Sequence, residues 1–199
     1  MKQLTLALLI CLAALAAATS AQTDAACPVE QLAAPAGCEL AYGGIRFTLH
    51  ASAGGSLSQL QIQPSGLAVD NSEITTELDG TAYLAEMADL DDDGWPEIYV
   101  YVSSAGSGSY GSLAAYAVNK GKSITPIYLP PLQHSPEVIE GYMGHDKFAV
   151  VDNRLIRSFP IYRKDDSNAA PGGGTRQLLY RLKPGEASWV LQLDRVVDE

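Results

Sequence analysis

Hydrophobic and polar residues alternate with a period of two over most of the chain beyond residue 44. Alternation of this kind, with many β-branched and aromatic residues, is typical of strands that bury one face. We predict ten strands, at Ile45–Leu49, Leu57–Ile62, Tyr83–Asp89, Glu97–Val102, Leu113–Val118, Ser123–Leu129, Lys147–Val151, Leu155–Tyr162, Gln177–Leu182 and Trp189–Leu193. No segment between them shows the period of an amphipathic helix, so the pattern favours an all-β chain.

Turn-forming residues separate the predicted strands. Asn119–Gly121, Asp152–Asn153 and Lys183–Gly185 contain Asn, Asp, Pro and Gly, which favour reverse turns. Strands that recur roughly every 8 to 12 residues with such turns predict an antiparallel β-sandwich of about eight or more short strands. The segment Lys164–Thr175 is the longest polar stretch, and we expect it to form a mobile surface loop.

The first residues have the composition of a secretory signal peptide. Lys2 precedes an apolar segment at Leu4–Ala18, and the small residues Thr19–Ala21 form a cleavage site. The apolar segment is shorter than the roughly 20 residues that a membrane anchor needs. We therefore predict a signal peptide at residues 1–21, a single domain at residues 22–199, and no membrane anchor after cleavage.

Two cysteines, Cys27 and Cys38, remain after the predicted cleavage. An exported protein reaches a compartment in which disulfides form, so we predict that this pair is bridged. The bridge belongs to an N-terminal arm at residues 22–44, which is rich in Ala and Pro. The sequence leaves open whether this arm is extended or contains one short helix.

Composition and charge argue against one class of function, the binding of nucleic acid. The chain has 13 Lys and Arg residues against 23 Asp and Glu residues, and its formal net charge is −10. An acidic surface repels a phosphate backbone, so we expect no nucleic-acid partner.

A set of catalytic residues is hard to assemble from the sequence. The three histidines do not have metal-ligand spacing, and no nucleophile elbow precedes a helix. We therefore predict that the protein is not an enzyme, with a secreted hydrolase as an alternative. His145, within Gly141–Asp146, is the histidine best placed for a role, and we expect it to be an ordinary loop residue.

A glycine-rich segment at Gly106–Gly111 has the glycine spacing of a dinucleotide-binding turn. That turn requires a following helix and an acidic residue about 20 positions later. The next residues alternate like a strand, and no Asp or Glu occurs at positions 98–136, so we expect no cofactor. We predict instead a flexible loop between two strands, which presents the hydroxyl groups of Ser107, Ser109 and Tyr110.

The same acid-free segment, residues 98–136, carries Lys120 and Lys122 as its only charged residues. A face that is neutral to positive within an acidic molecule can approach carboxylates without repulsion. The alternative is that interior strands simply avoid charge. Lys122 is therefore a candidate contact for an acidic partner.

Asp89, Asp91 and Asp93 lie at alternating positions ahead of a glycine, as in calcium-binding loops. The twelfth position of such a loop is a bidentate Glu, but Val100 stands there, which excludes an EF-hand. A shorter site that is closed by Glu97 stays open. We assign no metal ligand and expect an acidic turn whose aspartates cap backbone amides.

Seven short stretches, some of them discussed above, occur along the chain in an order that is specific to one protein family. They are Asp89–Tyr101, Ser103–Tyr110, Ile127–Leu132, Gly141–Asp146, Phe159–Tyr162, Asn168–Pro171 and Gly174–Leu178. Together they resemble the periplasmic inhibitors of invertebrate-type lysozyme, over roughly residues 80–195. The resemblance implies an exported, homodimeric β-sandwich protein of the Gram-negative periplasm, which binds a host lysozyme and blocks peptidoglycan cleavage.

In that family a Ser-Gly-x-Tyr loop enters the active-site cleft of the lysozyme, and the pattern falls on Ser107, Gly108, Ser109 and Tyr110. A lysozyme cleaves with two carboxyl groups, so an inhibitor needs neutral hydroxyl and amide donors. Glycine allows close backbone approach, and tyrosine is a stiff anchor. We predict these four residues and Lys122 as lysozyme-binding. The alternative function is a calcium-stabilised periplasmic module that binds a glycan or another envelope component.

Overall fold

The computed structural model describes residues 26–52 and 54–199. The predicted signal peptide at residues 1–21 lies outside them. Within the part of the chain that is described, no helix is both long enough and apolar enough to cross a membrane.

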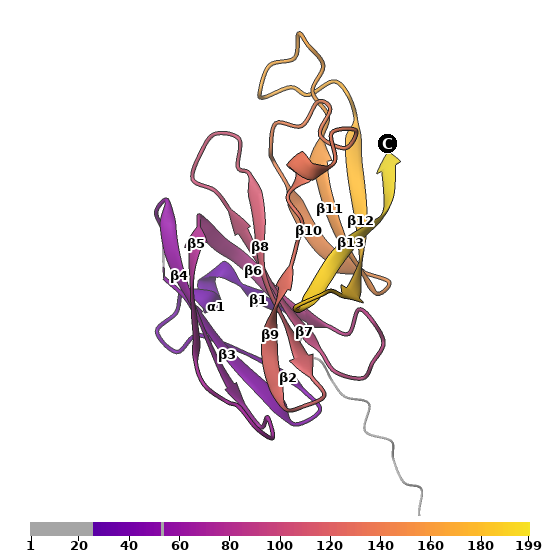
Figure 1. Cartoon of the computed structure of the whole chain (residues 1–199). Coiled ribbons are helices and arrows are strands. Elements are labelled where there is room, and N and C mark those ends of the chain that lie inside the picture. The colour runs from indigo at the N-terminus through magenta and orange to yellow at the C-terminus, as the bar shows by residue number, and fades with distance from the viewer. Residues whose placement is uncertain (1–25, 53) are drawn as a thin grey trace, which may run out of the picture.

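The described residues form an all-β fold with thirteen strands in two sheets (Figure 1). The strands are β1 (Ala26–Pro28), β2 (Cys38–Tyr42), β3 (Ile45–Ala51), β4 (Leu57–Ser65), β5 (Ile74–Asp79), β6 (Thr81–Ala88), β7 (Glu97–Ser103), β8 (Gly111–Asn119), β9 (Ser123–Tyr128), β10 (Lys147–Val151), β11 (Arg154–Pro160), β12 (Thr175–Pro184) and β13 (Trp189–Asp198). All ten predicted strands are confirmed, whereas β1, β2 and β5 were not predicted. Two short helical segments are α1 (Val29–Leu32) and η1 (Leu132–His134).

One sheet has nine strands in the order β1-β6-β7-β8-β9-β13-β12-β11-β10 and curls into a half-barrel, and the other has the order β2-β3-β4-β5 (Figure 1). Neighbouring strands are antiparallel except β9 and β13, where Ile127 lies opposite Trp189 in a parallel pair. The prediction of a purely antiparallel fold is wrong at this pair. After β9 the chain crosses to the far edge of the sheet and returns by hairpins, so β13 meets β9 pointing the same way.

β7 lies between two hydrophobic cores and is buried on both faces. Side chains alternate between the faces of a strand. Ile98, Val100 and Val102 therefore belong to the core shared with the four-stranded sheet, whereas Tyr99 and Tyr101 belong to the core inside the curled sheet. Burial on both sides fixes the two ends of β7, which carry the acidic turn before it and the glycine-rich loop after it.

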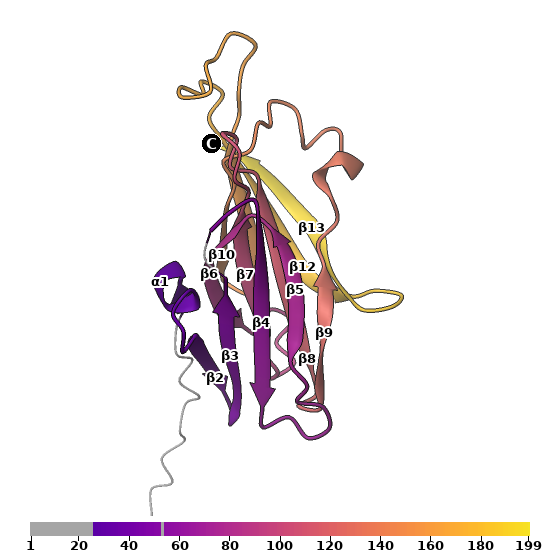
Figure 2. The same ribbon diagram turned by 90° about the vertical axis from the view of Figure 1, so that its left-hand side faces the viewer.

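The N-terminal arm joins the two sheets. β1 pairs with β6 of the nine-stranded sheet, whereas β2 pairs with β3 of the four-stranded sheet. Cys27 on β1 and Cys38 on β2 form the predicted disulfide, with their Cα atoms 5.9 Å apart. α1 lies between them, at the edge of the molecule next to β2 and β3 (Figure 2). The arm thus contains one short helix between two strands.

Candidate functional site

The glycine-rich loop, residues 104–110, joins β7 to β8 and closes on itself at its base. Ser104 N donates to Tyr110 O at 2.9 Å, and Tyr110 N donates to Ser104 Oγ at 2.9 Å. Near the tip, Ser109 N donates to Gly106 O at 3.0 Å, and Ser109 has a φ of +43°. The loop therefore has a defined, hydrogen-bonded conformation, and it presents a Tyr110 side chain that is 49% exposed.

A second segment, Gly141–Asp146, supports this loop. His145 N donates to Gly108 O at 2.6 Å. Gly144 has a φ of +90°, and a Cβ atom at this position would collide with Gly108 O. Only glycine satisfies both conditions, because it has no Cβ atom and adopts positive φ without strain. His145 is thus a loop residue whose backbone holds the glycine-rich loop.

A third segment, the polar loop at Lys164–Thr175, reaches the glycine-rich loop through Asn168. Asn168 Nδ2 donates to Ser107 O at 3.4 Å, and Asn168 Oδ1 lies 3.3 Å from His145 Nε2. Tyr162 OH donates to Asn168 O at 2.9 Å, which fixes the position of the asparagine. One side chain of the polar surface loop therefore holds the backbone of the glycine-rich loop.

A buried ion pair lies beneath these loops. Arg157 Nε donates to Asp146 Oδ1 at 2.6 Å, and both residues are less than a tenth exposed. Asp146 Oδ2 accepts hydrogen bonds from Gly111 N at 2.7 Å and from Tyr142 OH at 2.6 Å. Burial raises the pKa of Tyr142, so its hydroxyl stays protonated and remains a donor. Because Gly111 begins β8, this network fixes the point at which the glycine-rich loop enters the sheet.

Arg157 was missed among the predicted site residues, although the sequence contains a signal for it. It stands between Leu155 and Phe159 at an inward position of an alternating strand. A charged residue at such a position needs a buried partner. Nothing in the local sequence identifies Asp146 as that partner, because strand pairing brings the two together.

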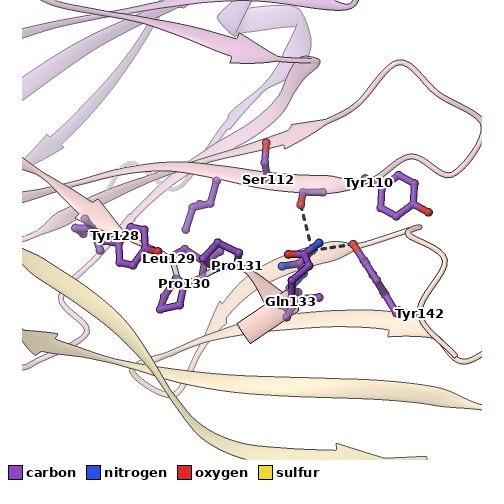
Figure 3. Close-up of a pocket in the computed structure, with 13 residues that line it drawn as sticks. Tyr110, Ser112, Tyr128, Leu129, Pro130, Pro131, Gln133 and Tyr142 are labelled. Carbon is purple, nitrogen blue, oxygen red and sulfur yellow. Dashed lines mark hydrogen bonds between the residues drawn. The ribbon is translucent and has the colours of Figure 1, made fainter. Parts of the chain in front are cut away.

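A pocket of about 390 Å³ lies beside the glycine-rich loop (Figure 3). Tyr110 and Tyr128 lie toward opposite ends of it, and their side chains are 49% and 55% exposed. Its lining residues are Tyr110, Gly111, Ser112, Leu113, Ile127, Tyr128, Leu129, Pro130, Pro131, Leu132, Gln133, Tyr142 and Arg157. Arg157 is the only charged residue among them, and Asp146 neutralises it. The pocket and the loop therefore form an uncharged surface on an acidic protein.

The structure separates Lys122 from the other predicted lysozyme-binding residues. Ser107–Tyr110 precede β8, whereas Lys122 lies in the turn after it. β8 spans nine residues, which corresponds to about 30 Å of strand. Figure 1 shows the loop before β8 toward the top of the molecule and the turn after β8 at the bottom. The acid-free segment therefore does not bring its lysines to the glycine-rich loop.

The acidic turn, residues 89–96, joins β6 to β7 at the end of β7 away from the glycine-rich loop. Asp89 accepts hydrogen bonds from Asp93 N at 3.1 Å and from Gly94 N at 2.8 Å. Asp93 Oδ1 accepts a hydrogen bond from Trp95 N at 2.8 Å. The predicted capping of backbone amides by these aspartates is confirmed.

Three carboxyl groups come together at the same turn. Asp89, Asp91 and Glu97 each place a carboxylate oxygen within 4.8 Å of the others, whereas Asp93 is not part of this cluster. The side chain of Glu97 is buried, and Leu90 N donates to its Oε2 at 2.8 Å. Burial and, to a lesser extent, the charges of Asp91 and Asp89 raise the pKa of Glu97 to about 8.

The glycine-rich loop, the segment Gly141–Asp146 and Asn168 gather at one end of the molecule, shown at the top of Figure 1. Searches of protein-family models, of curated proteins and of solved structures found no match to this chain.

Proposed function

We propose that the protein is an exported inhibitor of an invertebrate-type lysozyme, which inserts Ser107–Tyr110 into the active-site cleft and blocks peptidoglycan hydrolysis. The observation that carries this proposal is the convergence of the segments that resemble the inhibitor family. His145, Asp146 and Asn168 belong to two of those segments, and all three hold the backbone around the glycine-rich loop. Residues from segments that resemble the inhibitor family in sequence therefore support the same glycine-rich loop in the folded chain.

The chemistry of the loop suits a cleft that contains two carboxyl groups. Ser107, Ser109 and Tyr110 offer hydroxyl groups and add no charge. The hydrogen bonds that fix the loop before binding reduce the conformational entropy lost in the complex. An exposed tyrosine with an apolar ring and a polar tip is a frequent anchor of protein interfaces.

The finer features of the fold and the partner belong to the same proposal. We interpret the four-stranded sheet and the facing part of the nine-stranded sheet as the β-sandwich of the inhibitor family. Export to the periplasm and assembly into a homodimer are further parts of it. Sedimentation of the purified protein tests the dimer. The proposal predicts a species of twice the monomer mass.

The deciding experiment is a lysis assay with invertebrate-type, chicken-type and goose-type lysozymes, each with and without the purified protein. We expect protection of the bacterial suspension against the invertebrate type alone. The variant Tyr110→Ala serves as the matched control, since it keeps the fold and removes the predicted anchor. Lysis by the invertebrate-type enzyme at an unchanged rate would overturn the proposal.

The alternative function, a calcium-stabilised module that binds a glycan or an envelope component, makes a different prediction. It places a sugar against the glycine-rich loop and the tyrosines Tyr110 and Tyr128. Because the acidic turn lies at the other end of β7, a cation there has no direct contact with that surface. Retention of the protein on peptidoglycan or on envelope glycans, without inhibition of any lysozyme, would favour this alternative.

A further inference from the structure

We propose that the acidic turn before β7 is a binding site for a hard divalent cation, Ca²⁺, which is held by Asp89, Asp91 and Glu97. Their carboxylate oxygens lie within 4.8 Å of one another. Carboxylates at this separation repel one another, and a cation between them removes the repulsion. A set of oxygen ligands suits Ca²⁺ or Mg²⁺, in contrast to metals that prefer nitrogen or sulfur.

A buried oxygen of Asp91 provides an independent indication of a missing ligand. Asp91 Oδ1 is buried and has no hydrogen-bond partner among the described residues. Glu97, which is 2% exposed, belongs to the same cluster, and the hydrogen bonds from Leu90 N and Tyr99 OH both end on its Oε2. Burying a carboxylate oxygen without a partner costs free energy, and a cation supplies the interaction that is missing.

Basic side chains nearby do not neutralise the three carboxylates. Arg154, Arg181 and Lys183 line the pocket next to Asp91. Both arginines pair with Asp194, at 3.2 Å in each case. Within residues 26–52 and 54–199, no salt bridge reaches the three carboxylates of the acidic turn.

The geometry of the turn favours Ca²⁺ over Mg²⁺. Mg²⁺ requires a nearly ideal octahedron, whereas Ca²⁺ accepts about six to eight oxygens in irregular arrangements. Carboxylates from an irregular turn and from the first residue of β7 form an irregular arrangement of this kind. Because Asp89 directly follows β6 and Glu97 begins β7, the bound ion stabilises the pairing of these two strands.

The test is thermal unfolding of the purified protein after removal of metal with a chelator. We expect added Ca²⁺, at about tenfold its dissociation constant, to raise the melting temperature by roughly 3–6 °C. Asp91→Asn and Glu97→Gln each replace one carboxylate ligand by an amide of nearly the same shape, and we expect both variants to abolish the shift. Asp92→Asn is the matched control, because this neighbour lies outside the carboxylate cluster and should retain the full shift.

Two further measurements keep the test decisive if Glu97→Gln fails to fold. Tb³⁺ that occupies the site should luminesce when Trp95 in the same turn is excited, in the wild type and in Asp92→Asn but not in Asp91→Asn. The chelator-treated Asp91→Asn protein should melt at or above the temperature of the wild type, because a repulsion is removed. Absence of a Ca²⁺ shift in the wild type, or an equal shift in Asp91→Asn, would overturn the proposal whatever the lysis assay shows.

Discussion

Gly144 combines a φ of +90° with a position at which any Cβ atom would collide with Gly108 O. Gly144→Ala therefore displaces the glycine-rich loop from this contact, and we expect the proposed inhibition of the lysozyme to fall by about tenfold or more. Gly43→Ala is the matched control, because Gly43 also has a positive φ but nothing within 4 Å. Equal loss of inhibition in both variants would contradict the proposed role of the contact.

Tyr110 is the largest exposed side chain of the same loop. We expect Tyr110→Ala to weaken binding to an invertebrate-type lysozyme by about 1 kcal/mol or more, and Ser107→Ala to weaken it by less, because truncation of an interface aromatic costs most. Titration calorimetry measures both. Leu57→Ala, at a side chain 58% exposed on β4, controls for the loss of surface apolar area. Unchanged binding in the double variant Ser107→Ala/Tyr110→Ala would exclude insertion of the loop.

Individual elements depend on charges that the strands bring together. Asp146→Asn leaves Arg157 buried without its counter-ion, and loss of one partner of a buried pair costs about 3–5 kcal/mol. Asp194→Asn is the matched control, because its salt bridges with Arg154 and Arg181 are partly exposed and such pairs are worth less than about 1 kcal/mol. Urea unfolding measures both losses. A loss in Asp146→Asn no larger than in Asp194→Asn would show that the pair does not hold β8 to β11.

Strands were predicted correctly where one face meets a core. β5 shows why others were missed: it is an edge strand in which only Leu78 is buried, so its sequence has little hydrophobic alternation. β1 and β2 are short and lie in the Ala- and Pro-rich arm. The parallel pair of β9 and β13 depends on where a distant crossover places the chain, which periodicity does not encode.

Only part of the candidate site could likewise be predicted from the sequence. The glycine-rich loop was predictable because its glycines and hydroxyl residues are neighbours in the sequence. Asp146 and Asn168 were not predicted as its supports, because they lie 35 and 61 positions from Gly111 and Ser107, the residues that they hold. Only strand pairing and loop packing create those contacts.

At the scale of the whole molecule, β7 separates two polar ends. The glycine-rich loop follows its last residue, and the carboxylate cluster includes its first residue, Glu97. The side chains between them are buried in two cores, so the strand is a rigid spacer between these ends. The proposed cation site therefore contributes to the stability of the fold, whereas the proposed binding surface lies at the other end.

The disulfide is a covalent cross-link between the two sheets, because Cys27 lies on β1 and Cys38 on β2. The two cysteines are 11 positions apart, and a loop of that length stabilises the fold by about 2–3 kcal/mol through the entropy of the unfolded chain. We expect the double variant Cys27→Ala/Cys38→Ala to lose this amount in urea unfolding.

The proposed inhibition should be unchanged in this double variant at temperatures where it is folded, because His145, Asp146 and Asn168 support the glycine-rich loop from outside the arm. Reduction of the wild type should reproduce the loss of stability, and a reductant should have no further effect on the variant. An unchanged free energy of unfolding would mean that hydrogen bonds and packing alone hold the arm to both sheets. A loss of inhibition with the fold intact would place the arm, rather than the loop alone, at the proposed lysozyme interface.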